Sequence, residues 1–171
     1  MLMSHANNSE NDDAIATQPN ASDRRASVRA LKYWKSRAHS EHPPRLADIN
    51  LSEAETGLEN TFLLRVDTPV DRCVIIACGN ATRDKLKVNH LGGTFADSVP
   101  QNLRKDLLAA VGRAVLEREP QLAEGDFRTT DDDGDVLYRA AFLPVADVRQ
   151  QICYVYAVFT DNRPASLQAV H

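Results

Sequence analysis

The chain has 171 residues, of which 43% are hydrophobic and 26% are charged, a balance typical of one ordinary globular domain. Its formal net charge of −4 argues against a general affinity for nucleic acid, and no apolar run reaches the roughly 18 residues needed to span a bilayer. The first residues lack the basic region and apolar stretch of a secretory signal, and three cysteines are an odd number for a disulfide framework, so a cytoplasmic protein with reduced thiols is expected.

Residues 1–23 are rich in Asn, Asp, Ser and Ala, and their charged side chains are all acidic. A segment with so few apolar side chains buries too little surface to offset the entropy that is lost when it orders. We therefore predict a disordered acidic tail over residues 1–23. The last residues, 161–171, are expected to form a second, C-terminal tail.

The charge then changes sign, because the chain has six cations and no anion between Arg24 and Arg37. Apolar side chains recur in this segment at spacings of three and four, which places them on one face of a helix: Val28, Leu31, Trp34 and Ala38. We predict an amphipathic basic helix over residues 24–42, ended by the Pro43-Pro44 pair. The apolar face would pack on the rest of the domain or on a second copy, so Val28, Leu31 and Trp34 are the candidate interface.

Residues 43–160 carry the pattern of one α+β domain. Two strand-like runs are followed by a helical stretch and then by three longer strand-like runs: Phe62–Val66, Cys73–Cys78, Ala81–Glu119, Glu124–Thr130, Asp135–Pro144 and Gln150–Thr160. This order predicts a five-stranded antiparallel sheet with helices on one face and the N-terminal helix flanking it. Cys73 and Cys78 lie five positions apart along one predicted strand, and this odd separation predicts that they face opposite sides of the sheet.

Short motifs occur in a fixed order along this pattern. They are Tyr33-Trp34, Pro44-Arg45 with Asp48, Gly79, and Leu91-Gly-Gly-Thr94 with Asp97 and Pro100. In residue type and order these motifs resemble the PAS domain, specifically a subfamily of short bacterial proteins that consist of little else. The resemblance covers about Leu31 to Thr160, which is most of the chain.

The resemblance implies a fold and a function. It implies a PAS-like sheet with the strand order 2-1-5-4-3, and a regulatory sensor, commonly dimeric, that acts on kinases or other signalling proteins. We therefore expect a bacterial, cytoplasmic, single-domain PAS protein that regulates signal transduction by binding partners. The expected associations are a homodimer through the N-terminal helix and a signalling protein such as a sensor kinase.

A small apolar ligand could occupy a space between the sheet and the Ala81–Glu119 helices. The candidate lining residues come from three predicted strands and from the helical stretch: Ile76, Cys78, Leu86, Phe95, Leu107, Phe142 and Tyr156. A slip of one residue in strand register moves every side chain to the other face. The alternative therefore stays open that these side chains fill a closed core and that the protein is a structural adaptor without a ligand.

The residues of this chain argue against the two cofactors, flavin and haem, that related proteins bind. The flavin-binding, light-sensing relatives carry a reactive cysteine in an Asn-Cys-Arg type of motif on a helix, whereas the cysteines here fall on predicted strands. The haem-binding relatives need a histidine on or near the long helix, and His90, in a turn upstream of it, is the one candidate axial ligand. Relatives also often place an aromatic-arginine pair before the glycine at Gly79, where this chain has Val74–Cys78. We expect no cofactor.

The sequence also argues against a metal site and against catalysis. The acidic run Asp131–Asp135 is typical of a hairpin turn, because aligning Gly134 with the EF-hand glycine leaves Ala140 at the position of the bidentate acid. The chain has no Gly-x-Ser-x-Gly motif, no phosphate-binding glycine loop and no His-Glu-x-x-His motif. We therefore predict that the protein is not an enzyme. A small-ligand enzyme with paired titratable groups in a helix-lined cavity is the less favoured alternative.

Overall fold

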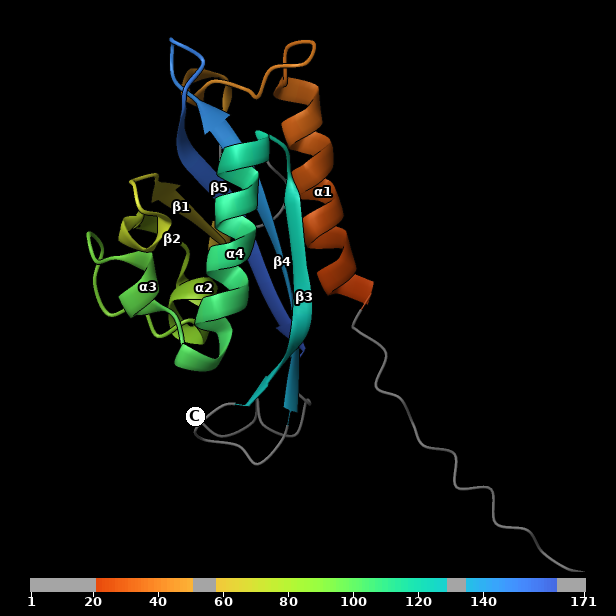
Figure 1. Ribbon diagram of the computed structural model, residues 1–171. Helices are drawn as coiled ribbons and strands as arrows, with labels where there is room; N and C mark the ends of the chain where they lie inside the picture. Colours follow the sequence, from red (N-terminus) through yellow and green to blue (C-terminus); the bar gives the residue numbers. More distant parts are fainter. Residues whose placement is uncertain (1–20, 51–57, 129–134, 163–171) are drawn as a thin grey trace, which may run out of the picture.

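An antiparallel sheet of five strands organises the chain (Figure 1). The computed structural model describes residues 21–50, 58–128 and 135–162. The strands are β1 Thr61–Arg65, β2 Val74–Cys78, β3 Gln121–Arg128, β4 Asp135–Ala146 and β5 Ile152–Asn162. Their spatial order is β2-β1-β5-β4-β3, and every neighbouring pair is antiparallel. The predicted fold class and strand order are confirmed.

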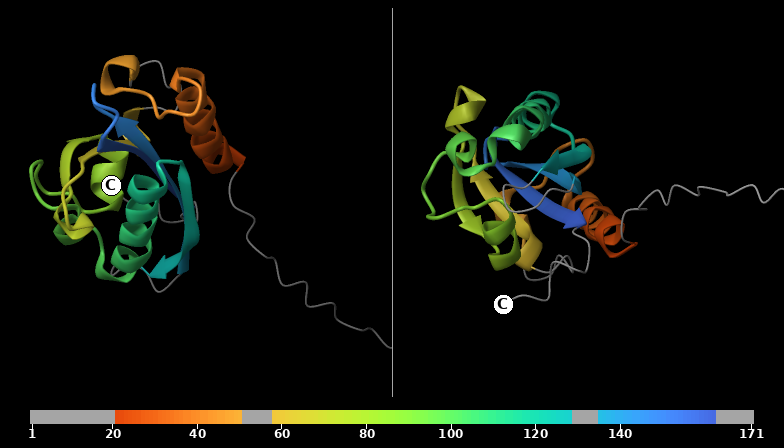
Figure 2. Two further views of the ribbon diagram at one scale, coloured as in Figure 1. Left: turned by 45° about the horizontal axis from the view of Figure 1, so that its top comes forward. Right: turned by 90° about the horizontal axis from the view of Figure 1, so that it is seen from below.

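Helices cover both faces of this sheet (Figure 2). One face, called the inner face here, is covered by α2 Asn80–Lys85, α3 Phe95–Ser98 and α4 Gln101–Glu117. The opposite, outer face is covered by α1 Ala21–Arg37. Single turns of 3-10 helix lie in the connections: η1 Leu46–Asp48, η3 Leu58–Asn60 and η4 Val70–Arg72. Each face of the sheet therefore has its own apolar cluster.

Strand β5 shows how the alternation of side chains divides the core. Val155, Ala157 and Phe159 belong to the inner cluster, while Tyr156 and Val158 belong to the outer one. All five side chains are fully buried, because β5 is the central strand and helices lie over both of its faces. A displacement of β5 is therefore felt on both sides of the sheet.

Strand β2 contains a bulge that moves its side chains between faces. Leu63 of β1 pairs with Ala77, but the next residue, Leu64, pairs with Ile75, so Ile76 is an extra residue on β2. An extra residue shifts the alternation by one position. Cys73 and Cys78 consequently both pack in the inner cluster, and the prediction that they lie on opposite faces is wrong.

The edge of β2 that does not pair with β1 is hydrogen-bonded to the loop before α3. Ile75 donates its backbone N–H to Gly93 O (3.1 Å) and accepts a hydrogen bond from Gly92 N (2.9 Å). Gly92 has a φ of 88°, in the left-handed region that favours glycine. Thr94 then caps α3, because its hydroxyl oxygen accepts a hydrogen bond from the backbone N–H of Asp97 (3.2 Å). The glycine-rich motif thus covers an exposed strand edge and starts a helix.

The boundaries of α1 differ from the predicted helix over residues 24–42. The helix begins at Ala21 and ends at Arg37. It ends early because Ser40 has a φ of 56° and the backbones of His39 and His42 exchange hydrogen bonds, which closes a tight turn ahead of the prolines. The rest of the predicted N-terminal tail, the turn at residues 131–134 and most of the C-terminal tail lie outside the described residues.

An ion pair ties the helical layer to the end of β5. Lys85 of α2 lies 3.0 Å from a carboxylate oxygen of Asp161, and it also donates a hydrogen bond to the side-chain oxygen of Asn60 (3.3 Å). The Asp161 side chain is 3% exposed and that of Lys85 is 22% exposed. Removing one partner of a buried pair leaves the other charge poorly solvated, whereas removing both does not.

We expect Lys85→Met to lower the free energy of unfolding by about 2 kcal/mol, less than for a fully buried pair because Lys85 is partly exposed. Urea denaturation followed by circular dichroism measures the loss. The double variant Lys85→Met with Asp161→Asn should lose less than the sum of the two single variants. Lys105→Met, at an exposed position of α4, is the matched control; an equal loss there would contradict the role of the ion pair.

Candidate functional site

Helix α1 lies on the outer face of the sheet through small side chains and one large one. Ala26, Ser27 and Ala30 are buried, which lets the helix backbone approach the sheet closely. Trp34 is 7% exposed, packs in the outer cluster and donates its indole N–H to the backbone oxygen of Pro144 (2.7 Å). A buried indole N–H needs such a partner, so Trp34 is both the apolar and the polar anchor of α1.

The three predicted interface residues do not share one environment. Trp34 is buried against its own sheet, Leu31 is half-buried and Val28 is 63% exposed. The buried stripe of α1 runs through Ala26, Ala30 and Trp34 instead, because the small side chains allow the closest packing and leave the larger ones at the flank. Val28 and Leu31 are therefore accessible on one side of α1, whereas Trp34 is not.

The connector after α1 is fixed to the helix and to the sheet by hydrogen bonds that its backbone makes. The Tyr33 hydroxyl donates a hydrogen bond to Asn50 O (2.9 Å) and accepts one from Asn50 N (2.7 Å). Pro44 O accepts a hydrogen bond from Ala146 N (2.9 Å), which joins the connector to the end of β4. The Tyr-Trp and Pro-Arg motifs thus act together, because Trp34 holds α1 and Pro44 holds the connector at the same end of β4.

The turn between β4 and β5 is held by Asp147. Its carboxylate accepts hydrogen bonds from the backbone N–H groups of Gln151 (2.9 Å) and Arg149 (2.7 Å). These two bonds favour the charged form, and they hold the pKa of the Asp147 carboxyl below its ordinary value. The turn follows directly on the residues that hold α1 and its connector.

A lowered carboxyl pKa means that the stabilisation by Asp147 is present at neutral pH and is lost as the pH falls through the folded-state pKa. We expect Asp147→Asn to destabilise the protein near neutral pH and to leave it indistinguishable from the unmodified protein in acid. Urea midpoints measured across the acid range check this expectation. A difference between the two proteins that is constant with pH would contradict it.

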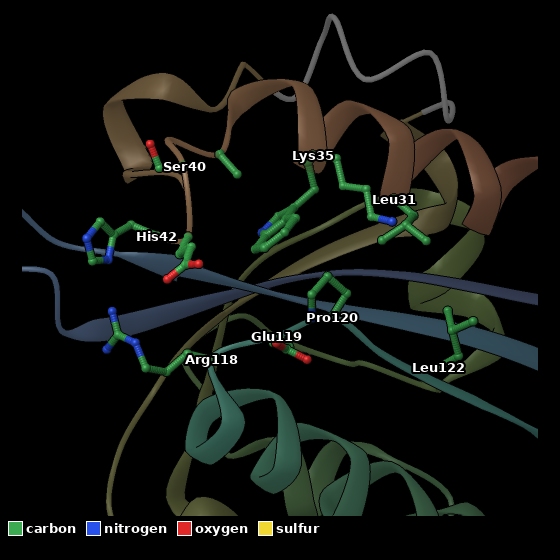
Figure 3. A pocket seen from close by; sticks show the side chains of 11 residues that line it. Leu31, Lys35, Ser40, His42, Arg118, Glu119, Pro120 and Leu122 are labelled. Atoms are coloured by element: carbon green, nitrogen blue, oxygen red, sulfur yellow. The ribbon is translucent and has the colours of Figure 1, made fainter.

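A groove runs between α1 and β3 on the outer face (Figure 3). Its volume is about 450 Å³, and its lining comes from α1, the turn after α1, the connection between α4 and β3, and β3 itself. Leu31 and Leu122 project at one end, while His42 and Arg118 lie at the other (Figure 3). Trp34, Ala38 and Pro120 also line it, so the groove is apolar along much of its length and polar at one end.

The seven predicted pocket residues are divided between the two faces. Leu86, Phe95, Leu107 and Phe142 are fully buried together in the inner cluster, and Cys78 packs at its margin. Ile76 and Tyr156 are not part of that cluster: Ile76 is exposed at the bulge, and Tyr156 is buried in the outer cluster with Trp34. The structure therefore brings five of the seven residues to the inner side of the sheet.

Aromatic rings fill the inner side where those five residues meet. The rings of Phe62 and Phe95 are stacked at 5.5 Å between centroids, and Phe142 meets Phe62 edge-on at 6.2 Å. A second group contains Tyr138, stacked on Phe159 at 5.8 Å and edge-on to Phe127 at 6.0 Å. Offset stacking and edge-to-face contacts are the favoured arrangements of such rings, so these side chains are well packed against each other.

Comparison with known proteins gives matches among solved structures. No protein-family model matches the chain, and no curated protein does. A PAS domain from Colwellia psychrerythraea is 11% identical over 66% of this chain and 96% of its own, with a TM-score of 0.47. A sensory box sensor histidine kinase from Vibrio cholerae is 12% identical over 67% and 91%, with a TM-score of 0.44. The PAS domain of BvgS from Bordetella pertussis is 17% identical over 64% and 80%, with a TM-score of 0.40.

The strand order β2-β1-β5-β4-β3, with helices on the inner face, is the order expected of a PAS domain. The fold is a PAS fold. No helix of the described residues is long and apolar enough to cross a membrane. The groove between α1 and the outer face was not predicted from the sequence, because the predicted pocket lies on the inner face. The signal available in the sequence was the spacing of Ala26, Ala30 and Trp34 by four residues, one helical turn.

The histidine and the cysteines that could contact a cofactor have different environments. His90 is exposed in the turn before α3. Burial raises the pKa of the Cys73 thiol and of the Cys78 thiol, which keeps both protonated and poorly nucleophilic at neutral pH. Within the part of the chain that the structure describes, no group of three or more His, Cys, Asp or Glu side chains could hold a metal ion.

Proposed function

We propose that this PAS domain is a cytoplasmic sensory or regulatory module that acts in signal transduction by binding partner proteins, such as a sensor kinase. The observation that supports the proposal is the attachment of α1, a basic helix with accessible Val28 and Leu31, on the outer face through small side chains and the single anchor Trp34. The accessible flank of this helix offers apolar and cationic side chains to a partner.

The mechanism is a shift of population between two positions of α1. Strand β5 connects the two faces, because Phe159 packs among the inner aromatic rings while Tyr156 packs in the outer cluster with Trp34. A change at the inner helices that displaces β5 alters the surface on which α1 rests. The connector, held by Tyr33 and Pro44, limits how far α1 moves when it is released.

A small apolar ligand on the inner side is the finer form of this proposal. It would lie among Cys78, Leu86, Phe95, Leu107 and Phe142, and the packed aromatic rings would have to open to admit it. The packing of those rings favours the second candidate, an adaptor whose filled core needs no ligand. Native mass spectrometry of the purified protein separates the two, since a co-purified mass favours the sensor and its absence favours the adaptor.

A homodimer through α1 is part of the proposal, and its test uses the two accessible residues. We expect Val28→Glu with Leu31→Glu to lower the mass measured by light scattering and to reduce the capture of a sensor kinase. Trp34 is left unchanged, because a charge at that buried position would unfold the outer cluster. Val148→Glu, at an exposed position of the β4–β5 turn, is the matched control. Unchanged mass and unchanged capture would remove α1 as the interface.

A further inference from the structure

The outer face of the sheet is only partly covered by α1. The helix packs on residues of β1, β4 and β5, whereas Leu122 of β3 is 56% exposed beside it. Leu31 of α1 lies across the groove from Leu122, and Pro120 lies beside them towards the middle of the groove (Figure 3). Val28, one helical turn before Leu31, extends the accessible apolar flank of α1. The space beside α1 therefore has an apolar floor and an apolar wall.

The solvent-exposed side of α1 is cationic. Arg25, Arg29, Lys32 and Lys35 form a row of exposed cations along the helix, which has no anion between Arg24 and Arg37. Lys35 also lines the groove. A partner in the groove therefore lies beside a cationic helix, whose row of positive charges reaches the groove through Lys35. Negative charges on the partner would favour its binding beside these cations, and positive charges would oppose it.

The acidic side chains near the groove do not cancel this row. Glu124 of β3 is paired with Arg139 of β4 at 2.7 Å, and Asp135 is paired with Arg128 at 2.9 Å, which leaves the single negative charge of the exposed Asp126 on the outer surface of β3. Glu41 and Glu119 line the groove together with Arg118 and Lys35, so these four charges cancel within it. The charge that selects a partner is therefore that of the remaining exposed cations of the row on α1, which are Arg25, Arg29 and Lys32.

From these observations we infer that the groove between α1 and β3 accepts an acidic amphipathic helix of a partner protein. The inference rests on the proposed function of partner binding and names the chemistry of the partner. Leucine-like side chains of that helix lie between Leu31 and Leu122, and its carboxylates face Lys32 and Lys35. A second copy of this chain is the competing occupant of this flank, and the homodimer of the proposed function would have to overcome the repulsion between two cationic rows.

The test uses the full chain and a fluorescent synthetic helix as long as α1, with Leu at positions i, i+3, i+4 and i+7 and Glu on both flanks. Fluorescence anisotropy should show binding that weakens as salt is added, because added ions screen the exposed charges. A matched peptide with Lys in place of every Glu should bind about tenfold more weakly or worse. A third peptide with Ser in place of every Leu should not bind.

Variants of the protein locate the site. Lys32→Glu with Lys35→Glu should reverse the preference, so that the lysine peptide binds more tightly than the glutamate peptide. Leu122→Ser should weaken both peptides without changing their order, and Val148→Ser, at the exposed β4–β5 turn, should change neither. Amide chemical shifts of the protein should move along α1 and β3 when the glutamate peptide is added.

Three results would overturn the inference: no binding of the glutamate peptide, equal affinity for the two charged peptides, or a preference that survives the double charge reversal. A stable dimer that excludes the glutamate peptide from α1 would assign the groove to a second copy instead. These outcomes are separate from the kinase-capture experiment. Loss of capture upon Val28→Glu with Leu31→Glu, without peptide discrimination, would keep the proposed function and reject only the acidic partner.

Discussion

Replacement of Trp34 by Ala is expected to lower the free energy of unfolding by about 3 kcal/mol, at the lower end of the cost of removing a large buried aromatic side chain. The loss has two sources. The indole is 7% exposed in the outer cluster, and its N–H donates a hydrogen bond to Pro144 O that α1 would no longer make. Urea denaturation followed by circular dichroism measures the change.

Two controls divide this effect into its parts. Trp34→Phe keeps an aromatic ring in the outer cluster and removes the donor, so it should lose about 1 kcal/mol from the unpaired Pro144 carbonyl, plus a small packing loss. Val28→Ala changes an exposed apolar residue on the same helix and should stay within about 0.5 kcal/mol of the unmodified protein. If Trp34→Ala costs no more than Val28→Ala, then α1 does not rest on the sheet in solution.

The strands could be predicted because their signal is local. Runs such as Val74–Cys78 and the alternation along β5 carry the period of a strand in consecutive residues, and the structure confirms these strands. The face that Tyr156 takes is not a local feature, and Tyr156 lies in the outer cluster rather than with the predicted pocket residues on the inner side. The strand order came from the resemblance to PAS domains, since no local pattern states which strands are neighbours. The long helix α4 and the turn with Gly92 and Gly93 are local features as well.

The faces of β2 and α1 could not be predicted, for two different physical reasons. The bulge at Ile76 depends on the pairing of β1 with β2, and no residue type within Val74–Cys78 indicates that a bulge forms there. The buried stripe of α1 contains Ala26 and Ala30, which a search for large apolar side chains passes over. Small side chains are needed where a helix packs closely on a sheet. The distance between α1 and the sheet depends on the packing of the whole molecule, so the sequence of α1 alone does not reveal it.

The groove is a further case, because its walls are distant in the sequence. Leu31 and Leu122 lie far apart in the sequence, and they meet only when α1 crosses the outer face beside β3. The same holds for Trp34 and Pro144, whose hydrogen bond joins residues 110 positions apart. The Tyr33-Trp34 motif indicates that Trp34 has a structural role, but it does not indicate that the partner of Trp34 is Pro144.

Replacement of Phe62 by Ala is expected to cost about 4 kcal/mol, a large part of the stability of a domain of this size. Phe62 is 2% exposed and contacts both Phe95 and Phe142, so its removal breaks two ring contacts and leaves a cavity on the inner side of the sheet. Chemical denaturation measures the loss. Phe62→Leu, which keeps most of the buried volume, should cost less than half as much.

The same variant tests whether the inner side is filled. An apolar cavity binds benzene, and a ligand that binds only the folded state raises the melting temperature. We therefore expect benzene to raise the melting temperature of Phe62→Ala and to leave that of the unmodified protein unchanged, because Phe62, Phe95 and Phe142 pack the space in the unmodified protein. An equal rise in both proteins would mean that the inner side already holds an open apolar site, and the ligand-binding sensor would then be favoured over the adaptor with a filled core.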